Sequence, residues 1–202
     1  MITSPMLRAF PDSFETERLL IRAPRPGDGA EMHAAVSESL AELRPWMPWA
    51  SEPQSPSAAE QNVIQAHADF LLRRDLRLLL YLRSDPATMV GGSGLHRIDW
   101  DVPRFEVGYW IRSRFGGQGY ITEAVRGIAA FAFRELDAER LEIWCDVRNE
   151  RSSAVARRVG FRHEATLRHN RRDSHGELTS AHGFGMLRDE ASAALAAEIN
   201  EG

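Results

Sequence analysis

A glycine-rich segment carries the clearest chemical signal in the sequence. Arg114-Phe115-Gly116-Gly117-Gln118-Gly119 lies between a strand-like stretch and a helix-like stretch. Successive glycines let the backbone turn its N–H groups towards an anion, and the N-terminus of the following helix adds a positive dipole end. Arg112 and Arg114 are expected to supply further positive charge at the rim. The segment therefore predicts a site for a phosphate or pyrophosphate group.

The spacing of the glycines restricts which phosphate ligand fits. The chain contains no lysine, so the Walker pattern Gly-x-x-x-x-Gly-Lys-Ser/Thr is absent. A dinucleotide fingerprint needs Gly or Ala where this chain has Thr122. What remains is the pattern Arg-x-x-Gly-x-Gly, matched by Arg114, Gly117 and Gly119. A tight turn without a ligand stays an alternative interpretation of so short a motif.

Two strands and a helix are expected to position this segment. Residues 105–111 alternate in polarity as a strand does, and apolar residues then recur at helical spacing to about residue 136. Residues 141–147 alternate again, and Asn149 is expected to cap a short helix that ends at Gly160. Because strand, helix and strand follow in this order, we expect two neighbouring parallel strands.

The remaining patterns place this unit in a larger mixed sheet. Further strands are expected at residues 19–21, 78–83, 89–98, 161–167 and 181–187, and further helices at 28–43, 57–74 and 189–198. Asp28 and Ser57 are the expected N-caps of the first two helices, and Glu60 is expected to complete a capping box with Ser57. The order of elements predicts an α+β fold, a mixed α/β sheet flanked by helices.

Length and composition limit the class of protein. A chain of 202 residues is the size of one domain, expected over 1–202 with a flexible N-terminus over 1–12 and a C-terminal tail over 189–202. A net charge of −4 and the lack of a long apolar run argue against nucleic acid and membrane as partners. Cys145 is the only cysteine, which fits a reducing cytoplasm, and its place within a strand predicts a core role.

Several short motifs, taken in order, resemble those of one enzyme family. They are Thr16-Glu17-Arg18-Leu19, Leu43-Arg44-Pro45-Trp46-Met47-Pro48-Trp49, Glu106-Val107-Gly108-Tyr109-Trp110-Ile111, Gly117-Gln118-Gly119-Tyr120-Ile121-Thr122-Glu123-Ala124, Asn149-x-x-Ser152 and Val159-Gly160-Phe161. Each motif alone is weak, but together they span most of the chain. The ordered set resembles the GNAT acetyltransferases and is most similar to their ribosomal-protein N-terminal acetyltransferase (RimL-type) branch.

The resemblance implies a fold and a donor site. In the GNAT family the central sheet splays between two parallel strands, here residues 105–111 and 141–147, and the pantetheine arm of acetyl-CoA inserts between them. Backbone groups of Tyr109, Trp110 and Ile111 would hold the pantetheine and polarise the thioester carbonyl. The pyrophosphate would bind at Arg114, Phe115, Gly116, Gly117, Gln118, Gly119 and Tyr120. The implied acyl donor is acetyl-CoA, and no metal is expected.

The resemblance also implies roles in catalysis. An amine would attack the thioester directly in a ternary complex, so Cys145 is not needed as a nucleophile. Asn149 would bind the cofactor and Ser152 would protonate the departing thiolate, although both also fit an N-cap and an exposed first-turn residue. Glu106 is the candidate general base, and a strand carboxylate paired with an arginine is its alternative. RimL-type enzymes can carry a further Glu at the position that corresponds to Arg171 here. The identity of the general base is therefore left open.

The acceptor side is expected near two tryptophans. Trp46 and Trp49 would line the acceptor channel, form a dimer contact or pack locally under a loop. The basic loop 168–175 either forms a solvated hairpin tip or attracts an acidic substrate by its positive charge. Related enzymes act on protein N-termini, polyamines, amino acids or antibiotics, and relatives alone imply a homodimer. A protein N-terminal α-amine is the first candidate, because a pKa of roughly 8 leaves some neutral amine at pH 7.

Two other functions stay compatible with the glycine-rich segment. A non-catalytic acyl-CoA-binding sensor or partner module would keep the segment without turnover, and the presence of both Asn149 and Ser152 argues against it. A nucleotide- or dinucleotide-dependent enzyme would use the same segment for a different phosphate. The missing lysine and the glycine spacing argue against that second alternative.

Overall fold

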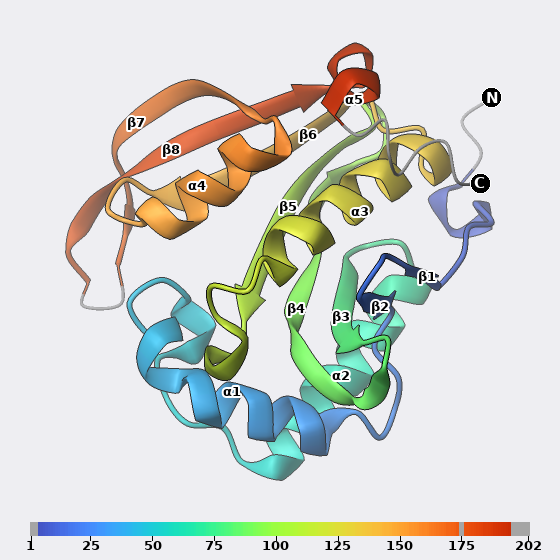
Figure 1. The fold of residues 1–202 in the computed structure, drawn as a ribbon, viewed down its shortest axis with the longest axis vertical. Coiled ribbons are helices and arrows are strands. Elements are labelled where there is room, and N and C mark those ends of the chain that lie inside the picture. Colours follow the sequence, from blue (N-terminus) through green and yellow to red (C-terminus); the bar gives the residue numbers. More distant parts are fainter. Residues whose placement is uncertain (1–3, 174–175, 195–202) are drawn as a thin grey trace.

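The computed structural model describes residues 4–173 and 176–194. An eight-stranded sheet forms its centre, in the order β1-β2-β3-β4-β5-β6-β8-β7 (Figure 1). The strands are β1 (Ser13–Glu15), β2 (Leu19–Arg22), β3 (Leu76–Leu82), β4 (Asp85–Asp99), β5 (Arg104–Ile111), β6 (Arg140–Asp146), β7 (Arg162–Arg172) and β8 (Leu178–Leu187). The helices are α1 (Gly29–Leu43), α2 (Pro56–Leu71), α3 (Tyr120–Glu135), α4 (Glu150–Val159) and α5 (Arg188–Ala194), with short 3-10 turns η1 (Pro5–Leu7), η2 (Pro48–Ala50) and η3 (Ser113–Phe115).

The two central strands separate from one another along their length. β5 and β6 pair in parallel, whereas the other neighbouring strands pair antiparallel. Parallel pairing begins at Arg104 with Arg140 and ends at Glu106 with Glu142. Both strands continue beyond that point, so the two halves of the sheet diverge there, as Figure 1 shows. The predicted mixed α/β sheet, splayed between two parallel strands and flanked by helices, is thereby confirmed.

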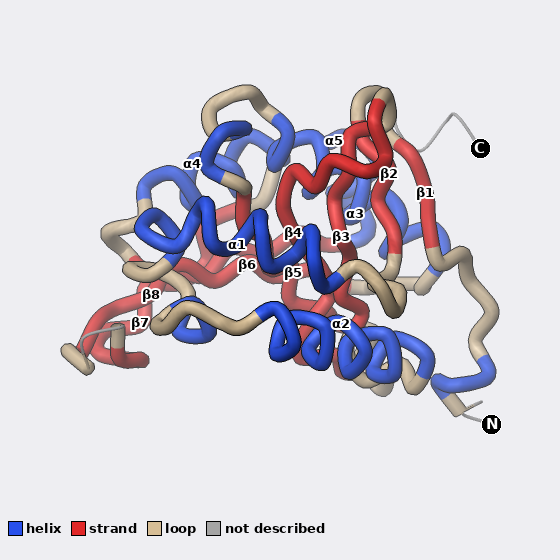
Figure 2. Tube along the Cα trace, turned by 90° about the horizontal axis from the view of Figure 1, so that it is seen from below, coloured by secondary structure: helices blue, strands red, loops and turns tan. Residues whose placement is uncertain are grey.

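Helices cover both faces of this sheet. α3 and α4 lie on one face and α2 on the other, while α1 packs against α2 and β4 (Figures 1 and 2). The main core lies between α3 and the central strands, and its buried residues include Ile128 and Phe131 of α3 together with Phe105 and Leu141 of the parallel pair. The apolar residues at helical spacing that predicted α3 include Val125, Ile128 and Ala132, all of which are buried in this core, together with most of the residues between them.

The start of α2 differs from the prediction. Pro56 is its first residue and Ser55 is its N-cap, with Ser55 Oγ accepting a hydrogen bond from the N–H of Ala58 at 3.2 Å. Proline suits the first helical position because its φ is fixed and that position needs no N–H. Ser57 therefore lies inside the first turn, and the capping box expected between Ser57 and Glu60 does not form.

Glu60 serves the neighbouring helix instead. Its carboxylate accepts hydrogen bonds from the N–H groups of Gly27 and Gly29, at 2.7 and 2.8 Å, and so satisfies donors at the start of α1. Asp28 stands at the N-cap position of α1 but makes no side-chain cap bond there. Its carboxylate forms an ion pair with Arg22 at 2.6 Å. The contact between α1 and α2, which no local pattern reveals, decides the partners of Glu60, whereas Asp28 pairs with Arg22 of β2.

Two residues of the segment 1–12, which the sequence predicts to be flexible, contact the rest of the protein; the flexibility itself stays a prediction. Arg8 donates a hydrogen bond to the carbonyl of Leu136 at 3.0 Å. Phe10 packs edge-on against Phe70, with ring centroids 6.0 Å apart. The short strand β1, which the sequence pattern did not predict, then adds an edge to the sheet.

The C-terminal tail is described in part. α5 covers the beginning of the helix expected over 189–198, and Ala191 is buried against the core. The residues from 195 onward lie outside the described part of the chain. Within the described part, no helix combines the length and the apolar character that crossing a membrane requires.

Candidate active site

The glycine-rich loop connects the splayed end of β5 to the start of α3. Gly117 and Gly119 have φ angles of 76° and 84°, a left-handed conformation that favours glycine. Within the described residues, no group accepts a hydrogen bond from the backbone N–H of Gly117, Gln118 or Gly119. The first turn of α3 adds further N–H groups that have no partner within the helix. Such a set of free donors at a helix N-terminus fits a pyrophosphate.

A network centred on Glu123 holds this loop in place. The Glu123 carboxylate accepts hydrogen bonds from Thr16 Oγ1 at 2.6 Å, from the N–H of Arg18 at 2.7 Å and from Arg18 Nε at 2.6 Å. Arg18 also donates to the carbonyl of Gln118 at 3.0 Å, and its guanidinium lies 4.4 Å from the centroid of the Tyr120 ring. Burial acts to raise the pKa of Glu123, but the hydrogen bonds from Thr16 and Arg18 outweigh it and lower the pKa.

The sequence predicted that Arg112 supplies positive charge at the rim of the loop, and this prediction is wrong. Its side chain is only 7% exposed and forms ion pairs with Glu31 and Glu38 of α1, both at 2.7 Å. Burial acts to raise the pKa of Glu38, and the hydrogen bond and charge of Arg112 lower it overall. The buried guanidinium thus ties the loop to α1. Arg114, by contrast, is exposed.

Sequence reasoning missed these anchoring partners. Glu123 and Thr16 are 107 residues apart, and Arg112 lies 74 residues from Glu38. No local spacing reveals contacts over such distances. The available signal was the presence of Arg18 and Glu123 inside the motifs that resemble the family, although the motifs did not indicate that the two residues meet.

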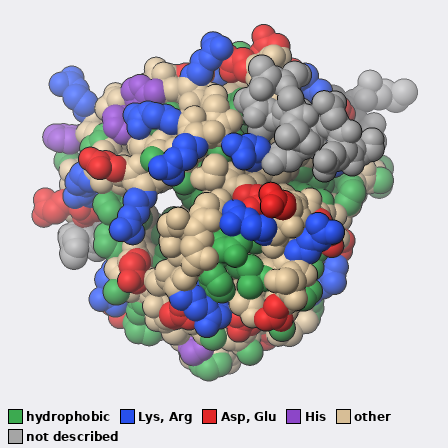
Figure 3. Space-filling view, in the orientation of Figure 1, with side chains coloured by type: hydrophobic (Ala, Val, Ile, Leu, Met, Phe, Trp, Pro, Cys, Tyr) green, Lys and Arg blue, Asp and Glu red, His purple; other side chains and the backbone are tan. Residues whose placement is uncertain are grey.

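A cavity of about 520 Å³ lies where β5 and β6 diverge. Predicted site residues from separate parts of the chain line it together: Trp46, Trp49, Glu106, Tyr109, Trp110, Asn149 and Ser152. Figure 3 shows an opening through the molecule between α4 and the loop that precedes α3. Ile111 and the loop residues 114–120 do not line this cavity. The predicted donor-site residues therefore form two sets, one at the loop and one at the cavity.

Ser152 and Tyr109 meet at the wall of this cavity. Tyr109 Oη lies 3.0 Å from Ser152 Oγ and donates a hydrogen bond to the Ser152 carbonyl, also at 3.0 Å. Burial raises the pKa of Tyr109 above its ordinary value, so the phenol keeps its proton at neutral pH. The sequence had given Tyr109 only a backbone role. The alternation of residues 105–111, which places its side chain on the same face as the buried Phe105, was the signal available.

Asn149 is the N-cap of α4, as predicted. Its side-chain oxygen accepts a hydrogen bond from the N–H of Ser152 at 3.0 Å. The helix ends at Gly160, whose φ of 106° forms the expected left-handed cap. The N-cap therefore fixes the backbone of the residue whose hydroxyl faces Tyr109. A role of Asn149 in cofactor binding stays a prediction.

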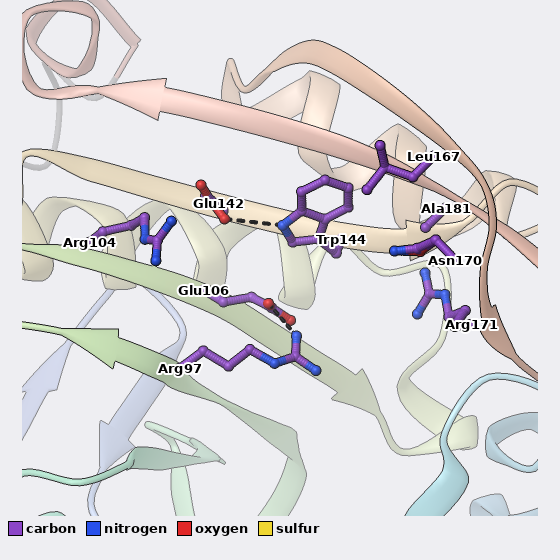
Figure 4. Close-up of a pocket in the computed structure, with 9 residues that line it drawn as sticks. All are labelled: Arg97, Arg104, Glu106, Glu142, Trp144, Leu167, Asn170, Arg171 and Ala181. Atoms are coloured by element: carbon purple, nitrogen blue, oxygen red, sulfur yellow. Dashed lines mark hydrogen bonds and ion pairs between the residues drawn. The ribbon is translucent and has the colours of Figure 1, made fainter.

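A second cavity of about 330 Å³ shares Arg97, Glu106, Trp144 and Arg171 with the first (Figure 4). Glu106 lies on its wall, at the point where the pairing of β5 with β6 ends. Its carboxylate forms an ion pair with Arg97, which Figure 4 marks with a dashed line. The interpretation of Glu106 as a strand carboxylate paired with an arginine is thereby confirmed. Its role as the general base stays a prediction.

Aromatic side chains form the opposite wall of the larger cavity. The rings of Trp49 and Trp110 pack edge to face, with an interplanar angle of 65° and centroids 6.0 Å apart. A Cβ atom at Gly92 would lie 2.5 Å from Trp110 Nε1, so glycine at this position makes room for the indole. Trp46 and Trp49 are 36% and 45% exposed, which leaves apolar surface at the cavity mouth.

The remaining candidates are placed as follows. Cys145 is buried as predicted, with its Sγ 3.3 Å from the hydroxyl of Ser153. Residues 168–172 of the expected basic loop 168–175 belong to β7 rather than to a loop, and His175 lies outside the described residues. No group of three or more His, Cys, Asp or Glu side chains suited to a metal ion occurs in the described chain.

Comparison with known proteins decides the family. Residues 18–162 match the family described as acetyltransferase (GNAT) domain. The chain belongs to the GNAT acetyltransferase family. The family prediction made from the motifs is therefore confirmed, and this GNAT acetyltransferase is an acetyl-CoA-dependent N-acyltransferase.

Individual relatives agree with this assignment. A Bacillus subtilis protein named "Putative ribosomal N-acetyltransferase YdaF" is 32% identical to this GNAT acetyltransferase over 156 residues, which is 75% of the chain and 82% of the relative. The ribosomal-protein-serine acetyltransferase of Escherichia coli is 24% identical over 153 residues, 76% of the chain and 84% of the relative. In fold the protein is similar to the ribosomal L7/L12 α-N-protein acetyltransferase RimL in complex with coenzyme A, with a TM-score of 0.79, 22% identity, and coverage of 85% and 95% of the two chains.

Proposed function

We propose that this GNAT acetyltransferase transfers the acetyl group of acetyl-CoA to the α-amine at a protein N-terminus. The observation that carries the proposal is the cavity where β5 and β6 diverge, because it joins the Ser152 and Tyr109 hydroxyls to an open aromatic wall. The Bacillus subtilis and Escherichia coli relatives, both named for ribosomal acceptors, support a protein N-terminus as the acceptor class. A cytoplasmic location follows from such acceptors.

The state of Glu106 also favours this acceptor class. Its carboxylate is engaged by Arg97, so an acceptor that requires little help from a base suits the site. A protein N-terminal α-amine has a pKa of roughly 8 and is partly neutral at pH 7, whereas a lysine amine with a pKa near 10 is not. Glu106, directly or through a water molecule, then needs only to take the proton that the amine loses on bond formation.

The backbone of the chain is arranged to hold the donor. Bound acetyl-CoA supplies a thioester whose carbonyl carbon the amine attacks. The free N–H groups of Gly117, Gln118 and Gly119, with Arg114 beside them, bind its pyrophosphate. Beyond Glu106 the β6 side of β5 has no partner strand, so backbone groups of β5 are available to the pantetheine and to the thioester carbonyl.

Ser152 then acts on the leaving group. As the bond from nitrogen to carbon forms and the bond from carbon to sulfur breaks, the Ser152 hydroxyl gives its proton to the thiolate and regains one from solvent. Tyr109 keeps the hydroxyl in position through the 3.0 Å contact. Asn149 fixes the backbone of Ser152 through the helix cap.

The donor site is tested by calorimetric titration with acetyl-CoA. We expect the wild-type protein to bind it and the Gly117→Trp variant to lose about 100-fold or more in affinity, because several hydrogen bonds to a charged group, each contributing about 1.5 to 3 kcal/mol, are blocked. The matched control is Gly176→Trp, since Gly176 also has a positive φ, 82°, and open space around its Cβ position. Loss of binding in both variants would contradict the placement of the site.

The transfer itself is tested by mass spectrometry of N-terminal peptides incubated with acetyl-CoA. We expect a mass increase of one acetyl group that is confined to the α-amine. Binding of acetyl-CoA without acetylation of any peptide, polyamine or amino acid would instead support the non-catalytic sensor. Binding of ATP or NADH in place of acetyl-CoA would support the nucleotide-dependent alternative.

A further inference from the structure

Arg171, the penultimate residue of β7, is partly buried, and two nitrogens of its guanidinium are buried without a partner. Its Nε and Nη2 atoms are shielded from solvent, and no described residue accepts a hydrogen bond from them. A buried charged donor left unpaired is costly, since it loses its hydration and gains nothing in return. Arg171 lines both cavities, so its side chain lies at the edge of the space in which an acceptor must bind.

The local backbone is deformed in a way that directs this side chain inward. In the pairing of β7 with β8, Leu167 is opposite Ala181 and Arg171 is opposite Thr179, so β7 carries extra residues between these pairs. His169 within this bulge has a φ of 49°, which is unusual for a residue other than glycine. Bulges re-aim side chains, and backbone strain of this kind gathers at functional sites. Figure 4 shows Arg171 beside Asn170, with its guanidinium directed into the cavity.

Three acidic side chains that line the cavities are each paired with an arginine. Glu106 is paired with Arg97, and Glu142 with Arg140 at 2.7 Å. In the larger cavity Asp146 is paired with Arg148 at 2.9 Å. None of these carboxylates forms an ion pair with Arg171. Within the described residues, the positive charge of Arg171 is therefore not balanced by any of the three.

We propose that Arg171 binds a carboxylate of the acceptor, and that the preferred acceptors are amines carrying a carboxylate close to the reacting nitrogen. The inference rests on the proposed function, whose acceptor it specifies. One carboxylate balances one guanidinium and matches its planar, paired donors. A phosphate monoester carries a charge of about −1.5 to −2 and would leave excess negative charge beside Glu106, Glu142 and Asp146. A carboxylate is therefore the better match.

The position of Arg171 links recognition to transfer. The larger cavity is lined by both Arg171 and Ser152, so one acceptor molecule can place a carboxylate at the first and its amine towards the second. Two sources offer this chemistry. One is an Asp or Glu side chain within the first few residues of a peptide, and the other is the α-carboxylate of a free amino acid.

The test measures acceptor binding to protein saturated with CoA, which carries no acetyl group, by calorimetry. Peptides with Ser at the N-terminus and Asp at the second, third or fourth position are compared with the matching Asn peptides, and serine is compared with serine amide. We expect the carboxylate member of at least one pair to bind about 10- to 100-fold more tightly, as for a charge-assisted hydrogen bond. The pair that shows the preference identifies the source of the carboxylate.

Variants then assign the preference to Arg171. Arg171→Gln is expected to reduce the preference to within about 3-fold and Arg171→Lys to keep part of it, since lysine retains the charge without the paired donors. The control is Arg168→Gln, which removes the same charge from an exposed position on β7 that lines neither cavity. Unchanged affinity for CoA shows that the variants are folded.

The outcomes separate the two proposals. Equal binding within every pair, or a preference that survives in Arg171→Gln, overturns the role of Arg171. Acetylation of peptides regardless of nearby carboxylates would leave the proposed function standing without this inference. Binding of a carboxylate through Arg171 with no acetylated product would uphold Arg171 as a carboxylate-binding residue and overturn the proposed function.

Discussion

At the scale of single residues, the chemistry depends on the hydroxyl of Ser152. We predict that Ser152→Ala lowers kcat by about 100-fold, because the departing thiolate loses its proton donor. Affinity for acetyl-CoA should stay near that of the wild type, since alanine retains the N–H that Asn149 caps. Steady-state kinetics and calorimetry measure the two quantities. The control is Ser153→Ala, which removes a neighbouring hydroxyl that contacts Cys145 instead, and an equal loss of kcat there would contradict the assignment.

Tyr109 acts through Ser152 and gives a second prediction at this scale. Tyr109→Phe removes the hydroxyl that lies 3.0 Å from Ser152 Oγ. The net contribution of one hydrogen bond, about 1 kcal/mol, predicts a fall in kcat of about 5-fold. Because the two residues act as one unit, the double variant with Ser152→Ala should be no slower than Ser152→Ala alone. Losses that multiply in the double variant would show that Tyr109 has an independent role.

At the scale of elements, the N-cap of α4 supports the same site. Asn149→Ala leaves the N–H of Ser152 without its partner and is predicted to lower the free energy of unfolding by about 1 kcal/mol. Asn149→Asp and Asn149→Ser should restore most of this stability, because both side chains can cap a helix. Urea unfolding followed by circular dichroism measures the change. Stability equal to that of the wild type in Asn149→Ala would show that the cap contributes little.

The same variants separate the cap from the predicted cofactor role. If Asn149 also binds acetyl-CoA through its amide, Asn149→Asp restores stability without restoring affinity. If Asn149 acts only as a cap, stability and affinity recover together. Calorimetry on the folded variants therefore decides between two roles that the sequence left open.

Helices and strands whose apolar residues recur at a regular spacing could be predicted from the sequence, because those residues are the ones that become buried. In α3 the apolar residues at helical spacing, such as Val125, Ile128 and Ala132, are buried, within a stretch that is buried at nearly every position from 124 to 133. In β5 the buried Phe105 and Val107 alternate with less buried neighbours. The helix starts were less predictable, because Glu60 caps a different helix from the one it belongs to. The prediction for Arg112 failed for the same reason: the side chain is buried by ion pairs with Glu31 and Glu38 of α1, which are distant in sequence.

In the candidate site, too, residues within short motifs could be predicted, whereas contacts between residues distant in sequence could not. Ser152, Asn149 and the glycine-rich loop could be identified from the sequence because each is part of a short motif. The Ser152–Tyr109 contact spans 43 residues and was not visible in any motif. Arg171 could be located in the sequence, but its lack of a partner depends on the pairing of every neighbouring charge in the folded protein.

At the scale of the whole molecule, Asp146 joins the two sides of the closing hairpin. It ends β6, accepts a hydrogen bond from Thr179 of β8 at 2.7 Å and pairs with Arg148, which also pairs with Asp173. Burial acts to raise the pKa of Asp146, but the hydrogen bonds from Arg148 and Thr179 outweigh it and lower the pKa from 3.8 to about 2. The folded state therefore favours the ionised carboxylate more strongly than the unfolded state does.

This difference makes stability depend on pH in a defined window. A group whose pKa is lowered on folding stabilises the protein fully above its unfolded pKa, and the stabilisation is lost as the pH falls through the folded pKa. Asp146 should thus contribute about 2 to 3 kcal/mol at neutral pH. Asp146→Asn should be less stable by a similar amount above about pH 5, and its deficit should shrink as the pH falls from about 4 towards 2. Urea unfolding of both proteins across this range measures the deficit. A deficit that is constant with pH would show that the Asp146 carboxylate stabilises the hairpin by its shape rather than by its charge.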